Sequence, residues 1–225
     1  MTWVLANLGL IWARTLDHVV LSLPPIVICF VIAVPLGWFA RRYRVSRGVI
    51  LTGAGLLYAV PSLPLIFVLP AVIGTSLLSP LNVIIALTLY GIALMVRVVA
   101  DGLDSVDADV RQSASAMGYS TWSRFWQVEL PLSGPVLLAG MRVVAVSTVS
   151  LVTVGAVIGV QSLGSLFTDG FQRGIQAEII AGLVATVALA LLFDGALVLA
   201  GRVLMPWTRR VAPPKPSVPL EVSAA

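Results

Sequence analysis

The chain has 225 residues, of which 59% are hydrophobic and 11% are charged, and its formal net charge is +4. A soluble domain carries about 25% charged residues, and the mean hydropathy here is +1.02, so composition excludes an ordinary soluble globule and a disordered chain. Because a membrane-crossing helix needs about 20 mostly apolar residues, we expect five or six spans and no separate catalytic domain.

Three reactive residue types are scarce, which limits the chemistry of this chain. It has one cysteine (Cys29), one histidine (His18) and one lysine (Lys215). One cysteine forms no internal disulfide, and this composition argues against a metal centre. A phosphate-binding loop of the Walker type requires Gly-Lys-Ser or Gly-Lys-Thr, whereas Lys215 lies between prolines. We therefore expect no metal or cofactor in this chain and no nucleic-acid partner, and if the work of this protein consumes ATP, another chain must bind it.

Five apolar segments are predicted to cross the membrane as helices, over about 19–40, 49–73, 81–100, 132–160 and 178–204. Before them, residues 1–17 carry apolar side chains at helical spacing and are predicted to form a separate interfacial helix. After them, the proline-rich tail 206–225 is predicted to be disordered. The expected fold is therefore an all-α integral membrane domain over 18–205.

The basic residues predict how these spans are oriented, because positive charge in short loops marks the cytoplasmic side. If the loop after the first span is cytoplasmic, the basic residues on or near that side are Arg41, Arg42, Arg44, Arg47, Arg97, Arg111, Arg124, Arg202, Arg209, Arg210 and Lys215. Only Arg14 and Arg173 lie on the other side. We predict an outside N-terminus, an inside C-terminus and a cytoplasmic loop over 101–131.

The second span contains a proline-rich break that is a candidate for the transport pathway. Tyr58 is followed by Pro61, Ser62 and Pro64. Prolines interrupt the helical hydrogen bonds, and the freed carbonyls can line a polar path. A simple packing kink is the alternative. On the pathway interpretation, Tyr58 and Ser62 face the pore.

Two charged residues are predicted to lie deep in the membrane. Arg142 and Asp194 lie at similar depths in the fourth and fifth spans. Charges at such depth face the bundle interior or a partner, so we expect the two side chains to pair. A buried ion pair or an interface contact is favoured over a contact with the substrate.

Other polar and small residues have simpler interpretations. His18 is predicted to be a polar group at the membrane interface, and Glu178 to be solvated at the outer end of the fifth span. Gly155, Gly159 and Gly164 predict a turn with a close helix contact at the outer end of the fourth span.

The loop 101–131 carries the clearest local signals. Asp107 is a good N-cap for a helix over 108–117, and Gly118 suits the position after its end, where φ is positive. Ser120 or Thr121 then caps a second short helix.

We expect that second helix to end before Leu130-Pro131. The small side chains at 113–116 would allow the first helix to enter a groove on another protein. A solvated linker with helix caps is the alternative.

Seven residues of this loop, at fixed spacings, resemble the EAA loop of ABC importer permeases. The family pattern is Glu-Ala-Ala, three residues, Gly, nine residues, Ile-x-Leu-Pro, and all its spacings hold here. The matching residues are Gln112, Ser113, Ala114, Gly118, Val128, Leu130 and Pro131. Gln112 and Ser113 depart from the pattern. The resemblance implies a coupling helix that docks on an ATP-binding subunit.

Further landmarks resemble the osmoprotectant branch, which carries glycine betaine, carnitine and choline. They are, in order, His18, Tyr58 to Leu63, Val106-Asp107, Leu138 to Arg142, and Ile158 to Gly164. The resemblance implies a type I, methionine-permease-like transmembrane domain in the inner or plasma membrane of a prokaryote. It also implies two ATPase subunits, a second permease that is identical or homologous, surrounding membrane lipid, and a separate extracytoplasmic binding protein.

Two alternatives remain open at this point. The chain could be an ABC permease for another small solute, such as an amino acid. A stand-alone channel or ion-coupled carrier would require a charged relay or two matching repeats of half-helices. Only Arg142 and Asp194 supply charge at depth, and the sequence contains no visible repeat, which disfavours that second alternative.

Overall fold

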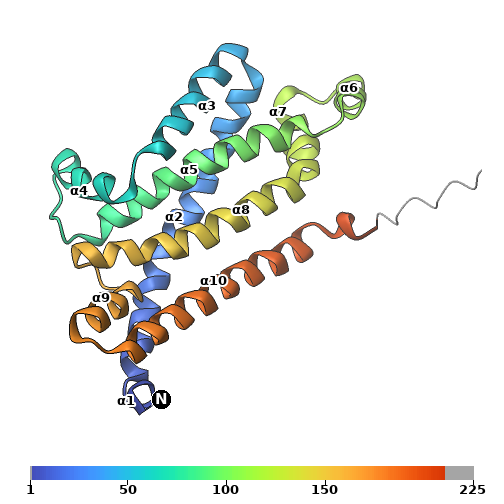
Figure 1. The fold of residues 1–225 in the computed structure, drawn as a ribbon. Coiled ribbons are helices and arrows are strands. Elements are labelled where there is room, and N and C mark those ends of the chain that lie inside the picture. The colour runs from blue at the N-terminus through green and yellow to red at the C-terminus, as the bar shows by residue number, and fades with distance from the viewer. Residues whose placement is uncertain (1, 211–225) are drawn as a thin grey trace, which may run out of the picture.

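The computed structural model describes residues 2–210, and every regular element in this range is helical (Figure 1). The long helices are α2 (Leu8–Arg42), α5 (Pro80–Asp104), α8 (Leu130–Val152) and α10 (Gln176–Leu204). The shorter α-helices are α1 (Thr2–Ala6), α3 (Arg44–Ala59), α4 (Ser62–Ile73), α6 (Ala108–Ala116), α7 (Thr121–Arg124) and α9 (Gly164–Arg173). The π-helix η1 (Phe125–Glu129) and the 3-10 helices η2 (Thr153–Ile158) and η3 (Pro206–Arg210) complete the described part.

Four helical stretches are long and apolar enough to cross a membrane, namely Leu8–Arg42, Pro80–Asp104, Thr121–Ile158 and Gln176–Leu204. Helices α3 and α4 together are also long and apolar enough, and they are bent by 104° at the break between them, as in a broken span or a re-entrant loop. With this bent pair counted as one span, the total is five, as the sequence predicted.

The helix that contains the first span begins earlier than the sequence predicted. Helix α2 starts at Leu8 and runs without a break to Arg42, so residues 8–17 extend this span, and α1 alone precedes it. The reason is packing, because Leu10 and Ile11 contact the apolar cluster around Leu163 and Leu166. In the predicted tail, residues 206–210 form η3, and the predicted disorder beyond them lies outside the described residues.

Helix α5 is the centre of the bundle. Its apolar stretch is 61% buried, against 11% for α10 at the edge. Glycines allow the neighbouring helices to approach closely: a Cβ at Gly140 would collide with Val98, and one at Gly201 would collide with Leu138. The hydrophobic effect contributes little to the association of helices within a membrane, so this close van der Waals packing holds the helix bundle together.

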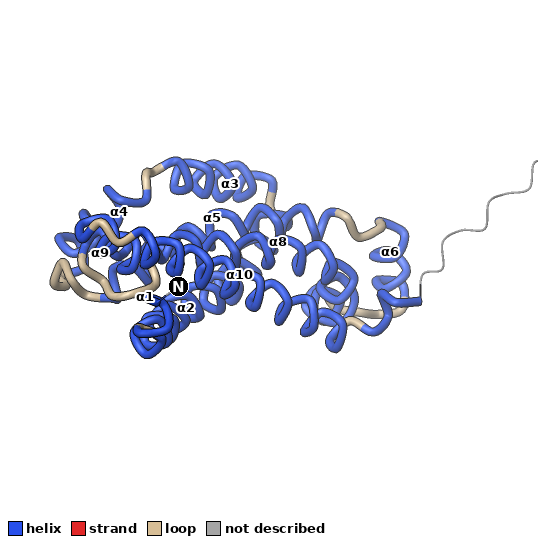
Figure 2. The backbone as a smooth tube through the Cα atoms, turned by 60° about the horizontal axis from the view of Figure 1, so that its bottom comes forward, coloured by secondary structure: helices blue, strands red, loops and turns tan. Residues whose placement is uncertain are grey.

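The loops gather at two opposite ends of the bundle, with α4 and α9 at one end and α6 at the other (Figure 2). The α2–α3 junction also lies at the α6 end, where Arg41 and Arg47 form ion pairs with Asp104 of α5. The predicted topology likewise places the α2–α3 junction and the α6 loop on one side of the membrane and the α4 and α9 segments on the other. Which end faces the cytoplasm stays a prediction.

Candidate functional site

The segment between α5 and α8 folds around two local signals. The carboxylate of Asp107 accepts a hydrogen bond from the Asp109 N–H at 2.9 Å and caps α6. After α6, Gly118 adopts φ +89°, a conformation that β-branched residues rarely adopt. The Tyr119 N–H donates to the Ala114 carbonyl across this bend at 3.2 Å. The first helix and its glycine bend are therefore present where the sequence predicted them.

The second helix does not end before Leu130, so that prediction was wrong. Ser120 caps α7, and α7, η1 and α8 then follow one another without an interruption. Pro131 lies in the first turn of α8, directly after the wider π-turn of η1. The loop is thus joined to the fourth span as one continuous helical stretch.

Helix α6 presents an exposed face. Gln112, Ser113 and Gly118 are exposed, whereas Ala114 is buried against the rest of the chain. The large side chain of Met117 at the end of α6 is also exposed. This outward face, which combines small and polar side chains with the apolar Met117, is available to a partner.

A basic cleft of about 400 Å³ lies behind α6. Its lining includes Arg41, Arg111, Gln112, Ser115 and Arg124. Gln112 stands where the family pattern has glutamate, so this position lies beside three arginines. A carboxylate at this position would meet a favourable positive field.

Glu129 ties the loop to the membrane helices. Its side chain is 2% exposed, and its two oxygens bind different arginines. Arg124 Nε donates to Oε1 at 2.7 Å, and Arg41 Nη1 of α2 donates to Oε2. A buried carboxylate costs free energy unless it is paired and hydrogen-bonded, so these two partners make its burial possible.

The ion pairs extend beyond Glu129 to the neighbouring helices. Arg41 Nε also binds Asp104 Oδ1 at 3.1 Å, and Arg47 of α3 binds the other oxygen of Asp104 at 2.6 Å. Arg124 Nη1 donates to the Ser115 hydroxyl of α6 at 2.6 Å. We call Arg41, Arg47, Asp104, Arg124 and Glu129 the charged anchor. It connects α2, α3, α5, α6, α7 and η1.

Sequence reasoning missed the charged anchor. The available signal was that arginines 41–47 and the acids at 101, 104 and 129 belong to loops on one predicted side. That signal predicts attraction between the loops, but it does not specify which residues meet.

Aromatic rings reinforce the same junction. Trp38 of α2 lies 5.7 Å from Phe125 of η1 and 6.1 Å from Trp122 of α7, measured between ring centroids. Phe125 is buried. Such edge and tilted ring pairs add to the stabilisation from burial, so the loop is held by apolar as well as charged contacts.

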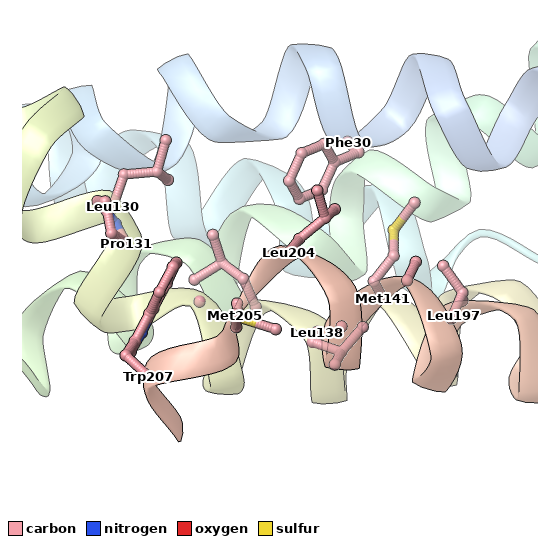
Figure 3. A pocket seen from close by; sticks show the side chains of 13 residues that line it. Phe30, Leu130, Pro131, Leu138, Met141, Leu197, Leu204, Met205 and Trp207 are labelled. Carbon is pink, nitrogen blue, oxygen red and sulfur yellow. The ribbon is translucent and has the colours of Figure 1, made fainter. Parts of the chain in front are cut away.

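The last two residues of the motif line an apolar groove of about 450 Å³. Leu130 and Pro131 lie at one end of it, near Trp207, and Leu204 and Met205 from the end of the chain's last span lie between them and Met141 (Figure 3). Leu130 and Pro131 therefore share this groove with the end of α10, so a displacement of the loop would change the packing there. Val128 is half-buried just before the groove.

The break between α3 and α4 contains the four candidate pathway residues. Tyr58, Pro61 and Pro64 are exposed, and Ser62 is half-buried. The hydroxyl of buried Tyr90 on α5 donates to the Val60 carbonyl at the break, and its ring lies 5.9 Å from that of Tyr58. Tyr90 thus supports the break from inside the bundle, while Tyr58 remains on the surface.

Arg142 and Asp194 form the ion pair that the sequence predicted. Nε and Nη2 of Arg142 donate to Oδ1 and Oδ2 of Asp194 at 2.6 and 2.8 Å. The pair is only partly buried within this subunit, with side chains that are 43% and 24% exposed, and the other expectation, an interface contact, stays a prediction. The pair joins α8 to α10 and still reaches the surface of the subunit.

His18, predicted as a polar group at the membrane interface, is fully buried inside the helix bundle. The Leu163 N–H donates to its Nδ1 at 3.3 Å, so Nε2 carries the proton and donates to the Val149 carbonyl at 2.9 Å. His18 therefore ties α2 to α8 and to the turn before α9. Within the described residues, no group of three or more His, Cys, Asp and Glu side chains is arranged to hold a metal.

Glu178 is also buried rather than solvated, with Arg173 at 3.8 Å. The predicted turn after the fourth span is present. Gly159 adopts φ +86°, and a Cβ at Gly164 would collide with the backbone of Thr153. This turn is a close backbone contact, as its glycines indicated.

A family model described as "Binding-protein-dependent transport system inner membrane component" matches residues 33–210. The osmoprotectant import permease protein OsmW of Salmonella typhimurium is 30% identical over 195 residues, which cover 85% of this chain and 90% of OsmW. The glycine betaine/carnitine/choline transport system permease protein OpuCB of Bacillus subtilis is 26% identical over 206 residues, which cover 92% of this chain and 94% of OpuCB.

Among solved structures, a chain of the MetNI methionine ABC transporter in an inward-facing conformation matches with a TM-score of 0.78 and 20% identity. The match covers 88% of this chain and 98% of that chain. At this level of identity, the likeness shows a common fold, which is the methionine-permease-like fold that the sequence predicted.

Proposed function

Because the chain belongs to the family of binding-protein-dependent transport system inner membrane components, we propose that it works with separate ATPase subunits and that the α6 loop couples them to it. Membership makes it a multi-pass permease of the inner or plasma membrane, a transport protein rather than an enzyme. The coupling assignment is carried by one observation, the charged anchor, which holds an exposed helix against the ends of the membrane helices.

The charged anchor supplies a route for mechanical coupling. When a partner moves α6, Arg124 carries the displacement to Glu129, and Glu129 carries it to Arg41 at the end of α2. The uninterrupted stretch from α7 into α8 carries the same displacement into the fourth span. Closure of the ATPase subunits would in this way switch the permease between its outward-open and inward-open states.

A second permease subunit, identical or homologous, completes the pathway in this proposal. Helix α3 has no buried residue. A Cβ added at Gly48, Gly53 or Gly55 would meet nothing within 4 Å, so these glycines are not required for packing inside this subunit. Small residues let membrane helices approach closely, which suits a helix from a second permease.

The proposed cargo is a small osmoprotectant such as glycine betaine, choline or carnitine, delivered by a separate extracytoplasmic binding protein. The names of OsmW and OpuCB support this substrate class. Exposed aromatic rings at Tyr58 and Phe67 suit passing contact with a quaternary ammonium, which aromatic faces attract through cation–π interactions.

Reconstitution in vesicles tests the proposal. The permease, its ATPase subunit and its binding protein should import glycine betaine only when all three and ATP are present. An ATPase variant that lacks its phosphate-binding lysine is the matched control and should abolish uptake. Uptake driven by an ion gradient without ATP would contradict the coupling assignment. ATP-driven uptake of methionine with no competition from quaternary ammonium compounds would contradict the cargo alone.

A further inference from the structure

An apolar groove of about 460 Å³ lies between α2 and the helical stretch that leads from the α6 loop into α8. Its wall on α2 runs from Phe30 to Phe39, and Trp122 and Trp126 belong to the opposite wall. Phe39 and both tryptophans are exposed, so the groove is open at the surface of the subunit. We call it the aromatic groove.

A polar cleft of about 260 Å³ adjoins the aromatic groove at Trp38, which lines both. Three arginines and two acids also line this cleft, namely Arg41, Arg42, Arg124, Asp104 and Glu129. Three positive charges against two negative ones leave the cleft positive. An apolar channel thus ends at a site that attracts anions.

Arg42 supplies the excess charge. The other two arginines of the cleft both bind Glu129. The Arg42 guanidinium, in contrast, has neither an ion pair nor a hydrogen bond among the described residues, and its one contact is with the ring of Tyr43, whose centroid lies 6.0 Å away. Since Arg42 is also exposed, it is available to an anion from outside the subunit.

The aromatic groove has the depth of one leaflet of a bilayer. From Phe30 to Arg42 the helix rises about 18 Å, at 1.5 Å per residue, and half of a hydrocarbon core of about 30 Å is about 15 Å. Helix α2 is one of the stretches that are long and apolar enough to cross a membrane. With Arg42 at the membrane surface, Phe30 therefore lies near the middle of the membrane.

The lining of the aromatic groove suits an acyl chain better than a partner helix. Membrane helices approach one another through small residues, such as the exposed glycines of α3. The described residues that line this groove include no Gly, Ala, Ser or Thr, and they are aromatic, branched or proline side chains. Tryptophans are enriched at the level of lipid headgroups, which is where Trp38 separates the groove from the polar cleft.

We propose that the aromatic groove and the polar cleft together bind one anionic phospholipid. Its phosphate lies against Arg42, and one acyl chain lies along the groove between Trp38 and Phe30. Basic pockets between membrane helices on the cytoplasmic side bind anionic headgroups by the same chemistry, and the cleft is on the predicted cytoplasmic side. The inference goes beyond the proposed function, because it concerns the membrane and neither the cargo nor the ATPase.

The lipid that stays bound to the purified protein tests this site. The complete transporter is reconstituted in vesicles of equal parts phosphatidylglycerol and phosphatidylcholine and extracted in detergent, and mass spectrometry measures the two retained lipids. The wild type should retain at least fivefold more phosphatidylglycerol. Arg42→Gln should lower this ratio by about fivefold, the contribution of one arginine near an anionic membrane surface.

The matched control is Arg44→Gln, which removes the same charge two residues further along the chain. Arg44 is exposed and lines neither the aromatic groove nor the polar cleft, so this variant should keep the wild-type ratio. Both arginines are on the surface, so both variants should fold.

A second pair of variants tests the aromatic groove itself. Val31 lines the groove and is 63% exposed, so Val31→Trp should fill it and lower the retained amount of both lipids. Val27 is 51% exposed about one turn earlier on α2 and outside the lining, so Val27→Trp should retain lipid as the wild type does.

Three results would overturn the lipid site: equal retention of both lipids by the wild type, an equal fall of the ratio in Arg42→Gln and Arg44→Gln, or unchanged retention in Val31→Trp. Separation of the two permease subunits in Val31→Trp without loss of lipid would assign the groove to a partner helix. None of these measurements requires transport, so a failure of the proposed function leaves this test intact.

Discussion

The α6 loop and the break between α3 and α4 differ sharply in how they are held. At the α6 loop, the charged anchor and the aromatic rings fix every segment to at least one other, and Glu129 is buried between two arginines. At the break between α3 and α4, most side chains are exposed, and one hydroxyl, that of Tyr90, supports the broken backbone. The comparison teaches that the loop is tied firmly to the membrane helices, which suits the proposed transmission of motion, whereas the candidate pathway segment has little support inside this subunit.

The largest effect on coupling is expected when Glu129, which binds two arginines of the charged anchor, is replaced. Glu129→Ala leaves Arg41 and Arg124 without their buried carboxylate, and removing one partner from a buried pair costs about 3–5 kcal/mol. We expect the protein to insert but to lose transport and the stimulation of ATPase activity by loaded binding protein. ATPase assays on the reconstituted complex measure this.

The matched control is Asp101→Asn, since Asp101 is exposed and lies 3.9 Å from Arg47. An exposed pair contributes about 0–1 kcal/mol, so this variant should retain stimulation. Normal coupling in Glu129→Ala would remove the contrast between the two regions.

The glycine bend is expected to give the next largest effect. Gly118→Val places a branched side chain at φ +89°, which costs about 1–3 kcal/mol of strain, and reorients α6. Transport should fall strongly while membrane insertion stays normal, as measured by uptake and by the amount of protein in membranes. Gly9→Ala is the control, because a Cβ there meets nothing. Wild-type uptake by Gly118→Val would refute the role of the bend.

A smaller effect is expected at the pathway break. Tyr90→Phe removes the hydrogen bond to the Val60 carbonyl, which contributes about 1 kcal/mol. Tyr58→Ala removes an exposed ring next to it. Both should change the maximal rate of uptake more than the apparent affinity, because in the proposed function a separate binding protein captures the cargo. A change confined to apparent affinity would place high-affinity binding in the permease instead.

The smallest effect is expected at the position where the chain departs from the family pattern. Gln112→Glu places a carboxylate in the cleft lined by Arg41, Arg111 and Arg124. The positive field should accommodate it, and uptake should match that of the wild type. Loss of uptake would mean that the neutral side chain at this position is itself required by the partner.

The features that the sequence predicted well depend on neighbouring residues alone. Apolar runs specify the spans, Asp107 caps the helix that follows it, and Gly118 forms the bend. Each of these signals acts within a few residues, so no knowledge of the tertiary packing is needed.

The features that the sequence did not predict depend on distant contacts. His18 is buried because α2 begins at Leu8 and its register carries the ring to the backbone of Val149 and Leu163. Glu129 finds Arg41 across 88 residues of chain. Composition indicates that such charges attract, but only the packing of the helices decides which of them meet.

The central claim is that the exposed face of α6 is the cytoplasmic docking surface for the ATPase subunits. Ser113→Cys, in a Cys29→Ser background, tests it with a membrane-impermeant thiol reagent, and Thr168→Cys reports on the opposite end. In inside-out vesicles stripped of the ATPase, Ser113→Cys should react, and adding the ATPase subunits should protect it. Thr168→Cys should react only in intact cells. Labelling of Ser113→Cys from outside intact cells, or no protection by the ATPase, would contradict the claim.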